Sequence, residues 1–292
     1  MKRTAVVLCC IFTAVYVPAK EIKMADISKA PVYTDAPEGF DQMHSGIKYG
    51  EITEDTYFSK TTGTDRKCNV LLPAGYDSSR KYPVIYLLHG IGGDHKEWLQ
   101  GNPVYIAGNA VAAGGVPCVI VMPNVRAMNP DRCPSDPFSA EAVAGFDNFI
   151  HDLFTDLMPF IENNYAVQTG RDNTAVAGLS MGGRESLYIG FTKQESFCAV
   201  GAFSPAPGLL PVSGFDGMFK PDSFKFKDGM QKPDFVLICT GDHDSMVGTV
   251  ATTYHETLIK NGVGHFWYVM PGDHNFTVWK NGLYNFCIRV FR

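Results

Sequence analysis

The six residues Gly178-Leu179-Ser180-Met181-Gly182-Gly183 have the residue types and spacing of a nucleophilic site. The pattern G-x-S-x-G places a serine on a sharp turn between a strand and a helix, so that its hydroxyl stands clear of the sheet. The apolar run 174–177 before it favours a buried strand, and residues 185–191 after it can form a helix. Small flanking residues permit the tight turn, and a helix N-terminus favours a developing negative charge. We therefore predict that Ser180 is a catalytic nucleophile.

A nucleophilic serine needs a base to take its proton and a carboxylate to orient that base. Of the four histidines downstream of Ser180, only His274 follows a C-terminal strand in a glycine-containing loop. Asp242 and Asp244 both follow the preceding predicted strand, so strand position alone leaves the orienting acid open. Asp242 comes directly after Gly241 and suits a turn-stabilising role. Asp244 lies beyond that turn, where its side chain could reach the His274 loop.

A second glycine-rich loop, His89-Gly90-Ile91-Gly92-Gly93-Asp94, follows the apolar run 82–88. In α/β-hydrolases a loop at this place supplies half of the oxyanion hole, and glycine lets the backbone turn an N–H group inward. The alternative is a plain strand-to-helix turn, and the downstream serine motif favours the oxyanion interpretation. We expect His89 itself to be structural.

Strand-like and helix-like runs alternate along the chain, which predicts βαβ units. We expect an α/β-hydrolase fold, with a mostly parallel central sheet and helices on both faces. No internal repeat or linker divides the chain, so residues 20–292 are predicted to form one esterase domain. Residues 141–164 carry apolar side chains at spacings of three and four and predict one long amphipathic helix. Strands are predicted at 51–60, 66–72, 82–88, 117–122, 174–177, 198–203, 234–239 and 265–270, and further helices at 249–261 and 275–291.

The first residues have the pattern of a secretory signal. Lys2 and Arg3 precede the uncharged apolar run 4–17, and Val17-Pro18-Ala19 offers small residues for cleavage after Ala19. We therefore expect residues 1–19 to be a signal peptide and the protein to be secreted, extracellular or periplasmic. No second apolar run is long enough for a membrane helix, so no membrane association is expected after signal removal.

Composition limits the partners further. The chain of 292 residues has a formal net charge of −5 and no long basic run, which makes nucleic acid an unsuitable partner. Outside the predicted signal, six cysteines remain at positions 68, 118, 133, 198, 239 and 287. Export would permit disulfides, and the sequence does not choose among their pairings. It also gives no indication of the oligomeric state.

The segment 208–233 is irregular, rich in glycine and lysine, and carries five large apolar side chains: Phe215, Met218, Phe219, Phe224 and Phe226. An insertion at this point of the predicted fold stands over the active site and could form part of an acyl pocket. An equally simple interpretation is a surface loop whose aromatic side chains pack on the body of the protein.

Several motifs together resemble carbohydrate esterase family 1, especially the feruloyl esterase domains attached to bacterial xylanases. The resemblance extends from about Tyr49 to Phe291 and is weakest over 208–233. It rests on Leu87 to Gly93 with Trp98, Phe146-Asp147-Asn148-Phe149, Gly178 to Gly183, Gly241 to Gly248, and His274 to Trp279.

This resemblance implies roles for individual residues. The family's nucleophile matches Ser180, its acid Asp244 and its base His274, and its oxyanion donors match the backbone N–H groups of Ile91 and Met181. Trp98 and Pro205 are added as candidate substrate contacts. Members of the family cleave ferulate or acetate esters on arabinoxylan outside the cell, with neither cofactor nor metal. The expected partner is therefore a feruloylated or acetylated xylan or oligosaccharide, with a feruloyl group preferred.

Other functions fit parts of the pattern. An acetylxylan esterase, an acyltransferase or a thioester hydrolase would use the same fold. A carbohydrate-binding module on a hydrolase scaffold would have little reason to keep all three groups of the triad. A metallohydrolase could draw ligands from two short clusters, but these offer few histidines: Asp242, His243, Asp244, Asp273 and His274.

Overall fold

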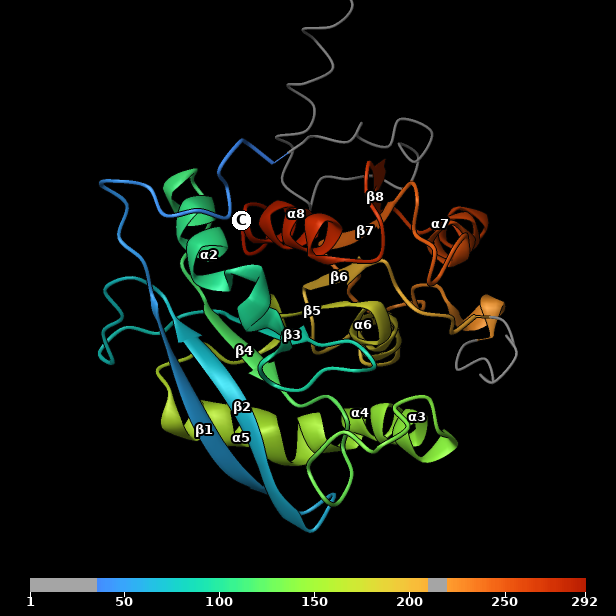
Figure 1. Ribbon diagram of the computed structural model, residues 1–292, viewed down its shortest axis with the longest axis horizontal. Coiled ribbons are helices and arrows are strands. Elements are labelled where there is room, and N and C mark those ends of the chain that lie inside the picture. Colours follow the sequence, from blue (N-terminus) through green and yellow to red (C-terminus); the bar gives the residue numbers. More distant parts are fainter. Residues whose placement is uncertain (1–35, 210–219) are drawn as a thin grey trace, which may run out of the picture.

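The computed structural model describes residues 36–209 and 220–292, which are built around one sheet of eight strands (Figure 1). Strand β1 forms an antiparallel hairpin with β2, and β2 is also antiparallel to β4. All remaining neighbours in the sheet are parallel. The order is β1-β2-β4-β3-β5-β6-β7-β8. The strands are β1 (Glu51–Ser59), β2 (Thr64–Leu72), β3 (Val84–Leu88), β4 (Val119–Pro123), β5 (Thr174–Leu179), β6 (Ala199–Phe203), β7 (Phe235–Gly241) and β8 (Phe266–Met270).

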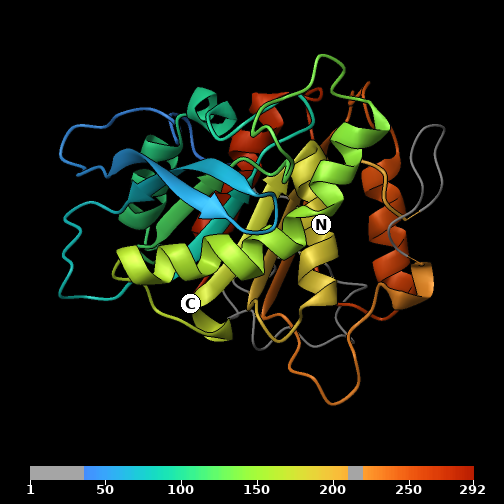
Figure 2. The same cartoon turned by 90° about the horizontal axis from the view of Figure 1, so that it is seen from below.

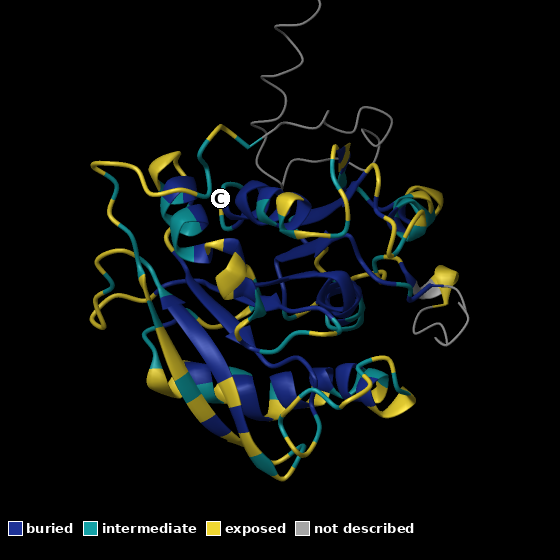
Figure 3. Cartoon of the chain, viewed as in Figure 1, coloured by how far each residue is buried: buried dark blue, intermediate teal, exposed yellow. Residues whose placement is uncertain are grey.

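The central strands supply two separate hydrophobic cores, because successive side chains of a strand point to opposite faces of the sheet. In β3, Tyr86 and Leu88 belong to one core, and Ile85 and Leu87 belong to the other. Every residue of β3, β4, β5 and β6 is buried, as expected of strands covered on both faces. Figure 3 shows these strands in dark blue between the helical layers.

Helices cover both faces of the sheet (Figures 1 and 2). On one face, α2 (Pro103–Ala112) packs against α8 (Phe276–Cys287), and α8 contacts β6 and β7. On the other face, α6 (Ser180–Thr192) packs against β5 and β6, and α7 (Val250–Lys260) packs against β7. The predicted α/β-hydrolase architecture, a mostly parallel sheet between helical layers, is therefore confirmed.

The long helix predicted at 141–164 is a chain of shorter pieces. It consists of α3 (Ala140–Asp147), α4 (Phe149–Asp152), a π-helical turn at Leu153–Leu157 and α5 (Met158–Asn164). Pro159 explains the interruption, because proline lacks an N–H group and its ring crowds the carbonyl one turn earlier. A wider π turn before proline accommodates that clash. Most of the apolar positions are buried, and Phe160 packs partly buried against the same core, so the predicted face was right although the helix is not continuous.

Helix α2 was not predicted. Its sequence contains Gly108 and Asn109, which are weak helix formers, and it starts at Pro103. Ile106 and Ala110 are nevertheless buried one turn apart, and packing against α8 stabilises the helix. The Asn109 side chain donates hydrogen bonds to two carbonyls of the segment that precedes β1. Tertiary contacts therefore outweigh a weak local propensity here. Short 3₁₀ turns complete the elements, at Glu97–Gly101, Arg171–Asn173 and Pro221–Ser223.

Two sequence predictions fall wholly or partly outside the described residues. The predicted signal peptide, residues 1–19, lies outside, as do Phe215, Met218 and Phe219. Phe224 is buried, and its ring lies 4.3 Å from that of Phe191, while the Phe226 ring stacks on Phe191 at 5.7 Å. These two aromatic side chains pack on the body of the protein, so the suggestion that they line an acyl pocket is corrected. Within the described part of the chain, no helix is both long enough and apolar enough to cross a bilayer.

The six cysteines outside the predicted signal are all free thiols in the structure. Five of them are buried, and Cys133 is partly exposed. Burial raises the pKa of Cys118 and Cys239 to about 12, so these side chains are neutral thiols at physiological pH. They behave as small hydrophobic residues of the core, as their apolar sequence surroundings indicated.

Candidate active site

Ser180 lies on the sharp turn between β5 and α6. Its φ is +51°, in the left-handed region that non-glycine residues seldom adopt. A side chain at Gly178 would meet the Gly182 backbone at 2.5 Å, and a side chain at Gly182 would meet the Leu88 carbonyl oxygen at 2.4 Å. The turn therefore depends on glycine at both flanking positions, because β3, β5 and α6 approach one another too closely for a methyl group.

Three side chains from separate loops form a hydrogen-bonded relay. His274 Nε2 lies 2.9 Å from Ser180 Oγ, and His274 Nδ1 lies 2.9 Å from Asp244 Oδ2. Ser180 follows β5, Asp244 follows β7, and His274 follows β8, so all three lie at the carboxyl edge of the parallel strands. The side-chain exposure is 1% for Asp244 and 11% for His274. The structure thus brings together the three residues predicted as a triad.

The Asp244 carboxylate is fixed by its own loop. Its Oδ1 accepts hydrogen bonds from the backbone N–H groups of Met246 and Val247 at 3.2 and 3.0 Å. Burial opposes ionisation, but hydrogen bonds from His274 and Val247 outweigh it and hold the pKa of Asp244 below its ordinary value. An ionised carboxylate at this place favours a proton on His274 Nδ1 and leaves Nε2 as the acceptor that faces Ser180 Oγ.

Asp242, the other candidate acid, contacts the backbone of the loop after β8 and not the His274 ring. Its Oδ1 accepts the backbone N–H of Gly272 at 2.9 Å and pairs with the exposed His243 ring at 2.6 Å. These bonds tie the turn after β7 to the loop after β8. Asp242 therefore makes the backbone contact that its position next to Gly241 suggested.

The glycine-rich loop after β3 lies directly beside Ser180. A methyl group at Gly90 would come within 3.3 Å of the Ser180 Cβ. The Ile91 N–H has no hydrogen-bond partner among the described residues, and Met181 lies in the first turn of α6, where backbone N–H groups lack partners within the helix. The two predicted oxyanion donors therefore belong to segments that meet at the serine.

The buried His89 and the partly exposed Glu97 hold this loop, and no sequence pattern pointed to Glu97. Glu97 Oε2 accepts the Gly90 N–H at 2.6 Å, and burial raises the pKa of Glu97 although that hydrogen bond opposes the change. His89 accepts the Val125 N–H on Nε2 at 2.8 Å, so its proton is on Nδ1, which donates to the Gly90 carbonyl at 2.7 Å. His89 is thus a neutral, structural histidine.

The motif Phe146-Asp147-Asn148, which is part of the family resemblance, contacts three segments around the site. The Phe146 ring makes an edge contact with the ring of His89. Asp147 forms an ion pair with Arg184 in α6 at 2.7 Å. Asn148 Nδ2 donates to the carbonyl oxygen of Ala127 at 3.0 Å. One short motif therefore fixes the oxyanion loop, the helix after the serine and the loop after β4.

The two suggested substrate contacts are packing residues in this structure. Trp98 is 1% exposed, and its Nε1 donates to the Leu88 carbonyl oxygen at 3.0 Å. Pro205 is buried against Gly183. This burial argues against Trp98 as a substrate contact and places its indole in the core, against Phe203 and Phe276. Trp279 has a clearer relation to the site, because its ring packs edge-to-face on His274 with a centroid distance of 5.1 Å.

A metal centre finds no support in the described residues. Across 36–209 and 220–292, no three His, Cys, Asp or Glu side chains are grouped to hold a metal ion. Asp273, one of the ligands considered, accepts hydrogen bonds from the backbone N–H groups of Ser245 and His274.

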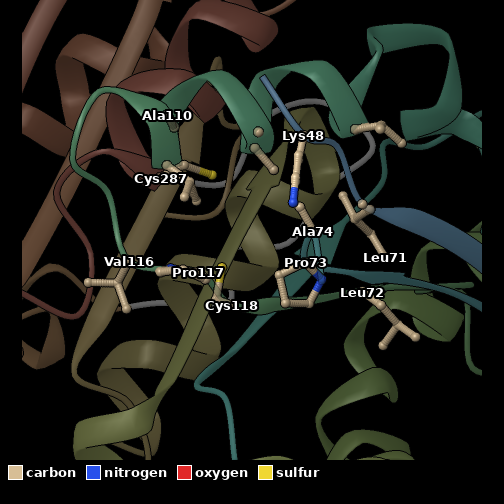
Figure 4. Close-up of a pocket in the computed structure, with 15 residues that line it drawn as sticks. Lys48, Leu71, Leu72, Pro73, Ala74, Ala110, Val116, Pro117, Cys118 and Cys287 are labelled. Carbon is tan, nitrogen blue, oxygen red and sulfur yellow. The ribbon is translucent and has the colours of Figure 1, made fainter. Parts of the chain in front are cut away.

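A separate pocket, shown in Figure 4, is lined mainly by apolar side chains of β2, α2 and the segment before β4. Neither Ser180 nor His274 lines it, so it lies apart from the relay.

The buried His89 predicts a pH dependence of stability. Burial lowers the pKa of His89 to about 4 from an ordinary value of 6.5. Between these values the unfolded chain binds a proton that the folded protein excludes, so stability falls as the pH is lowered from 6.5 to 4. The loss between pH 6.5 and 4.5 is on the order of 2 kcal/mol. We expect urea unfolding at pH 6.5 and 4.5 to show this decline in the wild type.

The matched variant for this measurement is His89→Asn, whose amide can still donate to the Gly90 carbonyl but cannot titrate. Its stability should change less over the same pH interval, whatever its absolute value. Equal declines in both proteins would show that other groups cause the pH dependence.

A serine on a glycine-flanked turn, a histidine and an aspartate at the carboxyl edge of a mostly parallel sheet define the class of α/β-hydrolases. Residues 59–289, most of the chain, match the family model named Esterase. The chain belongs to this esterase family, and it is an esterase.

Similar proteins agree with this assignment. A xylanase/feruloyl esterase of Xylanibacter ruminicola is 28% identical over 263 residues, which are 87% of this chain and 33% of that protein. The chain thus spans about a third of the length of that relative. A CE1 ferulic acid esterase of the anaerobic fungus Anaeromyces mucronatus is 38% identical, with a TM-score of 0.83 over 90% of this chain and 98% of that one. The same enzyme in complex with ferulic acid gives a TM-score of 0.82, at 38% identity over 89% and 97% of the two chains. The resemblance to carbohydrate esterase family 1 is confirmed.

Proposed function

We propose that this protein hydrolyses feruloyl esters of plant cell-wall xylan through a Ser180–His274–Asp244 triad. The observation that carries the mechanism is the relay, in which His274 is hydrogen-bonded to Ser180 and Asp244 at 2.9 Å each. The feruloyl group is supported by the similar enzyme that has been solved with ferulic acid. The xylan substrate is supported by the name of the Xylanibacter relative, which joins a xylanase to a feruloyl esterase.

In the first half of the reaction, Ser180 Oγ attacks the ester carbonyl carbon while its proton moves to His274 Nε2. The carbonyl oxygen becomes an oxyanion, which the N–H groups of Ile91 and Met181 stabilise. The bond to the sugar oxygen then breaks, and His274 returns the proton to that oxygen. The products are a free sugar hydroxyl and an acyl group bound to Ser180.

In the second half, water takes the place of the sugar hydroxyl. His274 removes a proton from the water as it attacks the acyl carbon, and the same oxyanion donors act again. Collapse of the intermediate breaks the bond to Ser180 Oγ, which recovers its proton from His274. The carboxylic acid leaves, and the enzyme returns to its starting state without a cofactor.

A preference for aromatic acyl groups is the specificity expected of this proposal. We expect kcat/KM for methyl ferulate to exceed that for methyl acetate by ~10²-fold, because binding of the aromatic acyl group contributes to transition-state stabilisation. The two esters share a leaving group, so the comparison isolates the acyl side. Steady-state rates on both esters, followed by release of acid from feruloylated and acetylated xylan, measure the preference.

A higher kcat/KM for the acetyl ester, on both the methyl ester and the polysaccharide, would instead identify an acetyl esterase. That outcome would overturn the feruloyl preference and leave the esterase assignment in place.

We also propose that the protein is exported with removal of residues 1–19. The support is the sequence pattern of two basic residues followed by an apolar run and small residues before Lys20. N-terminal sequencing of the protein recovered from its native host tests this, with Lys20 expected as the first residue. Recovery of an intact Met1 from inside the cell would contradict it.

A further inference from the structure

Arg126 carries a buried guanidinium group that points at the oxyanion loop. It follows β4, and the residue is 0% exposed. Its Nη2 donates to the carbonyl oxygen of Ile91, and both Nη atoms make longer contacts, of 3.4 and 3.5 Å, with the carbonyl oxygen of Gly93. The side chain therefore joins the loop after β4 to the loop that contains an expected oxyanion donor.

No carboxylate of the described residues lies within ion-pairing distance of this guanidinium. Nearby Arg66 is different, because it pairs with Asp131 at 2.9 Å and with Asp152 at 3.3 Å. Burial lowers the pKa of Arg126, as expected when a cation leaves water. A buried, unpaired cation is costly to a fold. Groups whose ionisation is perturbed in this way cluster at functional sites.

The surroundings of Arg126 fix where its charge lies. Its guanidinium carbon lies 5.2 Å from the centre of the Phe146 ring, the same ring that contacts His89. A methyl group at Gly145 would come within 2.7 Å of the Arg126 Cγ, so the arginine stem passes where only glycine leaves room. The aliphatic stem of Arg126 and its guanidinium group are thus both held in place.

The contacts of His89 and Arg126 with the loop carbonyls determine the direction of the N–H groups that follow. In a planar trans peptide the C=O and the following N–H point in opposite directions. His89 holds the Gly90 carbonyl, which directs the Ile91 N–H away from the imidazole. Arg126 holds the Ile91 carbonyl, which directs the Gly92 N–H away from the guanidinium. The N–H groups of Ile91 and Gly92 therefore each point away from the side chain that holds the preceding carbonyl.

We propose that Arg126 is the positioning residue of the oxyanion loop. Its guanidinium fixes the carbonyls of Ile91 and Gly93 and places a positive charge at the peptide that directly follows the expected oxyanion donor, the Ile91 N–H. Both effects favour the charged tetrahedral intermediate over the neutral ester, because preorganised dipoles and charges act where negative charge develops. The inference deepens the proposed mechanism and rests on it.

The test compares Arg126→Met and Arg126→Lys with wild type on p-nitrophenyl acetate and methyl ferulate. Arg126→Met should lower kcat by ~10²–10³, the loss typical of an impaired oxyanion hole, while KM changes by less than about threefold. Arg126→Lys should recover part of kcat, because lysine keeps the charge but cannot hold two carbonyls in a fork. Labelling of Ser180 by a fluorophosphonate, which forms a tetrahedral phosphonate ester whose phosphoryl oxygen takes the place of the oxyanion, should slow in parallel with kcat.

Arg289→Met is the matched control. Arg289 is a partly buried arginine that also donates to a backbone carbonyl, that of Asn285, at 2.8 Å. It lies near the start of β6 and β7, at the edge of the sheet opposite Ser180. Loss of stability is expected in this variant, with kcat unchanged. An equal fall of kcat in Arg289→Met would show a general effect of losing a buried arginine and would overturn the proposal.

If Arg126→Met does not fold, Gly145→Ala is measured in its place. Its added methyl group displaces the stem of Arg126, while the positive charge of the arginine is retained. A fall in kcat of ~10-fold or more is expected on both substrates. Unchanged kcat in either variant, or a loss confined to KM, overturns the role of Arg126. Activity on p-nitrophenyl acetate that survives in Ser180→Ala would instead refute the proposed triad, so the two failures are distinguishable.

Discussion

Replacement of Ser180 by alanine should lower kcat on methyl ferulate by ~10⁴–10⁶ and leave the fold intact. The loss is large because the serine oxygen forms the bond to the acyl group, and no other described hydroxyl shares its hydrogen bond to His274. The fold should survive because the substitution removes a single oxygen atom whose hydrogen bond is to His274. Alanine also retains the backbone strain at φ +51°, so the turn itself is not relieved.

Stopped-assay rates with purified wild type and Ser180→Ala measure this effect, and thermal unfolding of both proteins is the control for folding. Mass spectrometry after brief exposure to substrate should find an added acyl group on the wild type and none on the variant. Retention of more than a tenth of wild-type turnover would exclude Ser180 as the nucleophile.

Replacement of Asp244 by asparagine should lower kcat by ~10⁴, because an amide at this position would no longer hold His274 in the required tautomer. Asparagine has nearly the same shape, and its oxygen can still accept hydrogen bonds from the N–H groups of Met246 and Val247. The side-chain nitrogen would then face His274 Nδ1 as a donor, which favours a proton on Nε2 and removes the base. Steady-state kinetics on methyl ferulate test this expectation.

Asp242→Asn is the matched control, since it makes the same change two positions away on the same loop. Asp242 holds the Gly272 N–H and does not contact His274 in the structure. We expect about 1 kcal/mol less stability from the weakened hydrogen bond and nearly normal turnover. An inactive Asp242 variant beside a normal Asp244 variant would reverse the two assignments.

The sheet and the serine turn could be predicted from sequence because both depend on local patterns. Fully apolar runs such as 84–88 identify strands buried on both faces. The motif G-x-S-x-G places glycine where the tight turn leaves no room for a side chain. The choice of His274 followed from its place after the last strand. In each of these cases the sequence neighbours of a residue determine its surroundings.

What sequence could not predict depends on contacts between distant segments. Arg126 follows β4 without any motif, and its role becomes visible only when its guanidinium meets the loop at Ile91. Trp98 was a candidate substrate contact, but the chain folds it into the core against the end of β3. Helix α2 has weak local propensity and exists because α8 covers it. Pattern reasoning has no access to these partners.

The edge position of β8 has a consequence for how the enzyme loses activity under stress. Strand β8 ends the sheet and is less buried than the strands between β4 and β7, with Val269 42% exposed. Ser180 and His274 are joined across 94 positions of sequence, so the relay exists only while this edge is in place. Segments with few buried contacts open at the lowest free-energy cost, well before the whole domain unfolds. When the β8 edge opens, catalytic turnover should therefore fall before any spectroscopic signal from the core changes. During refolding, turnover should be the last property to recover.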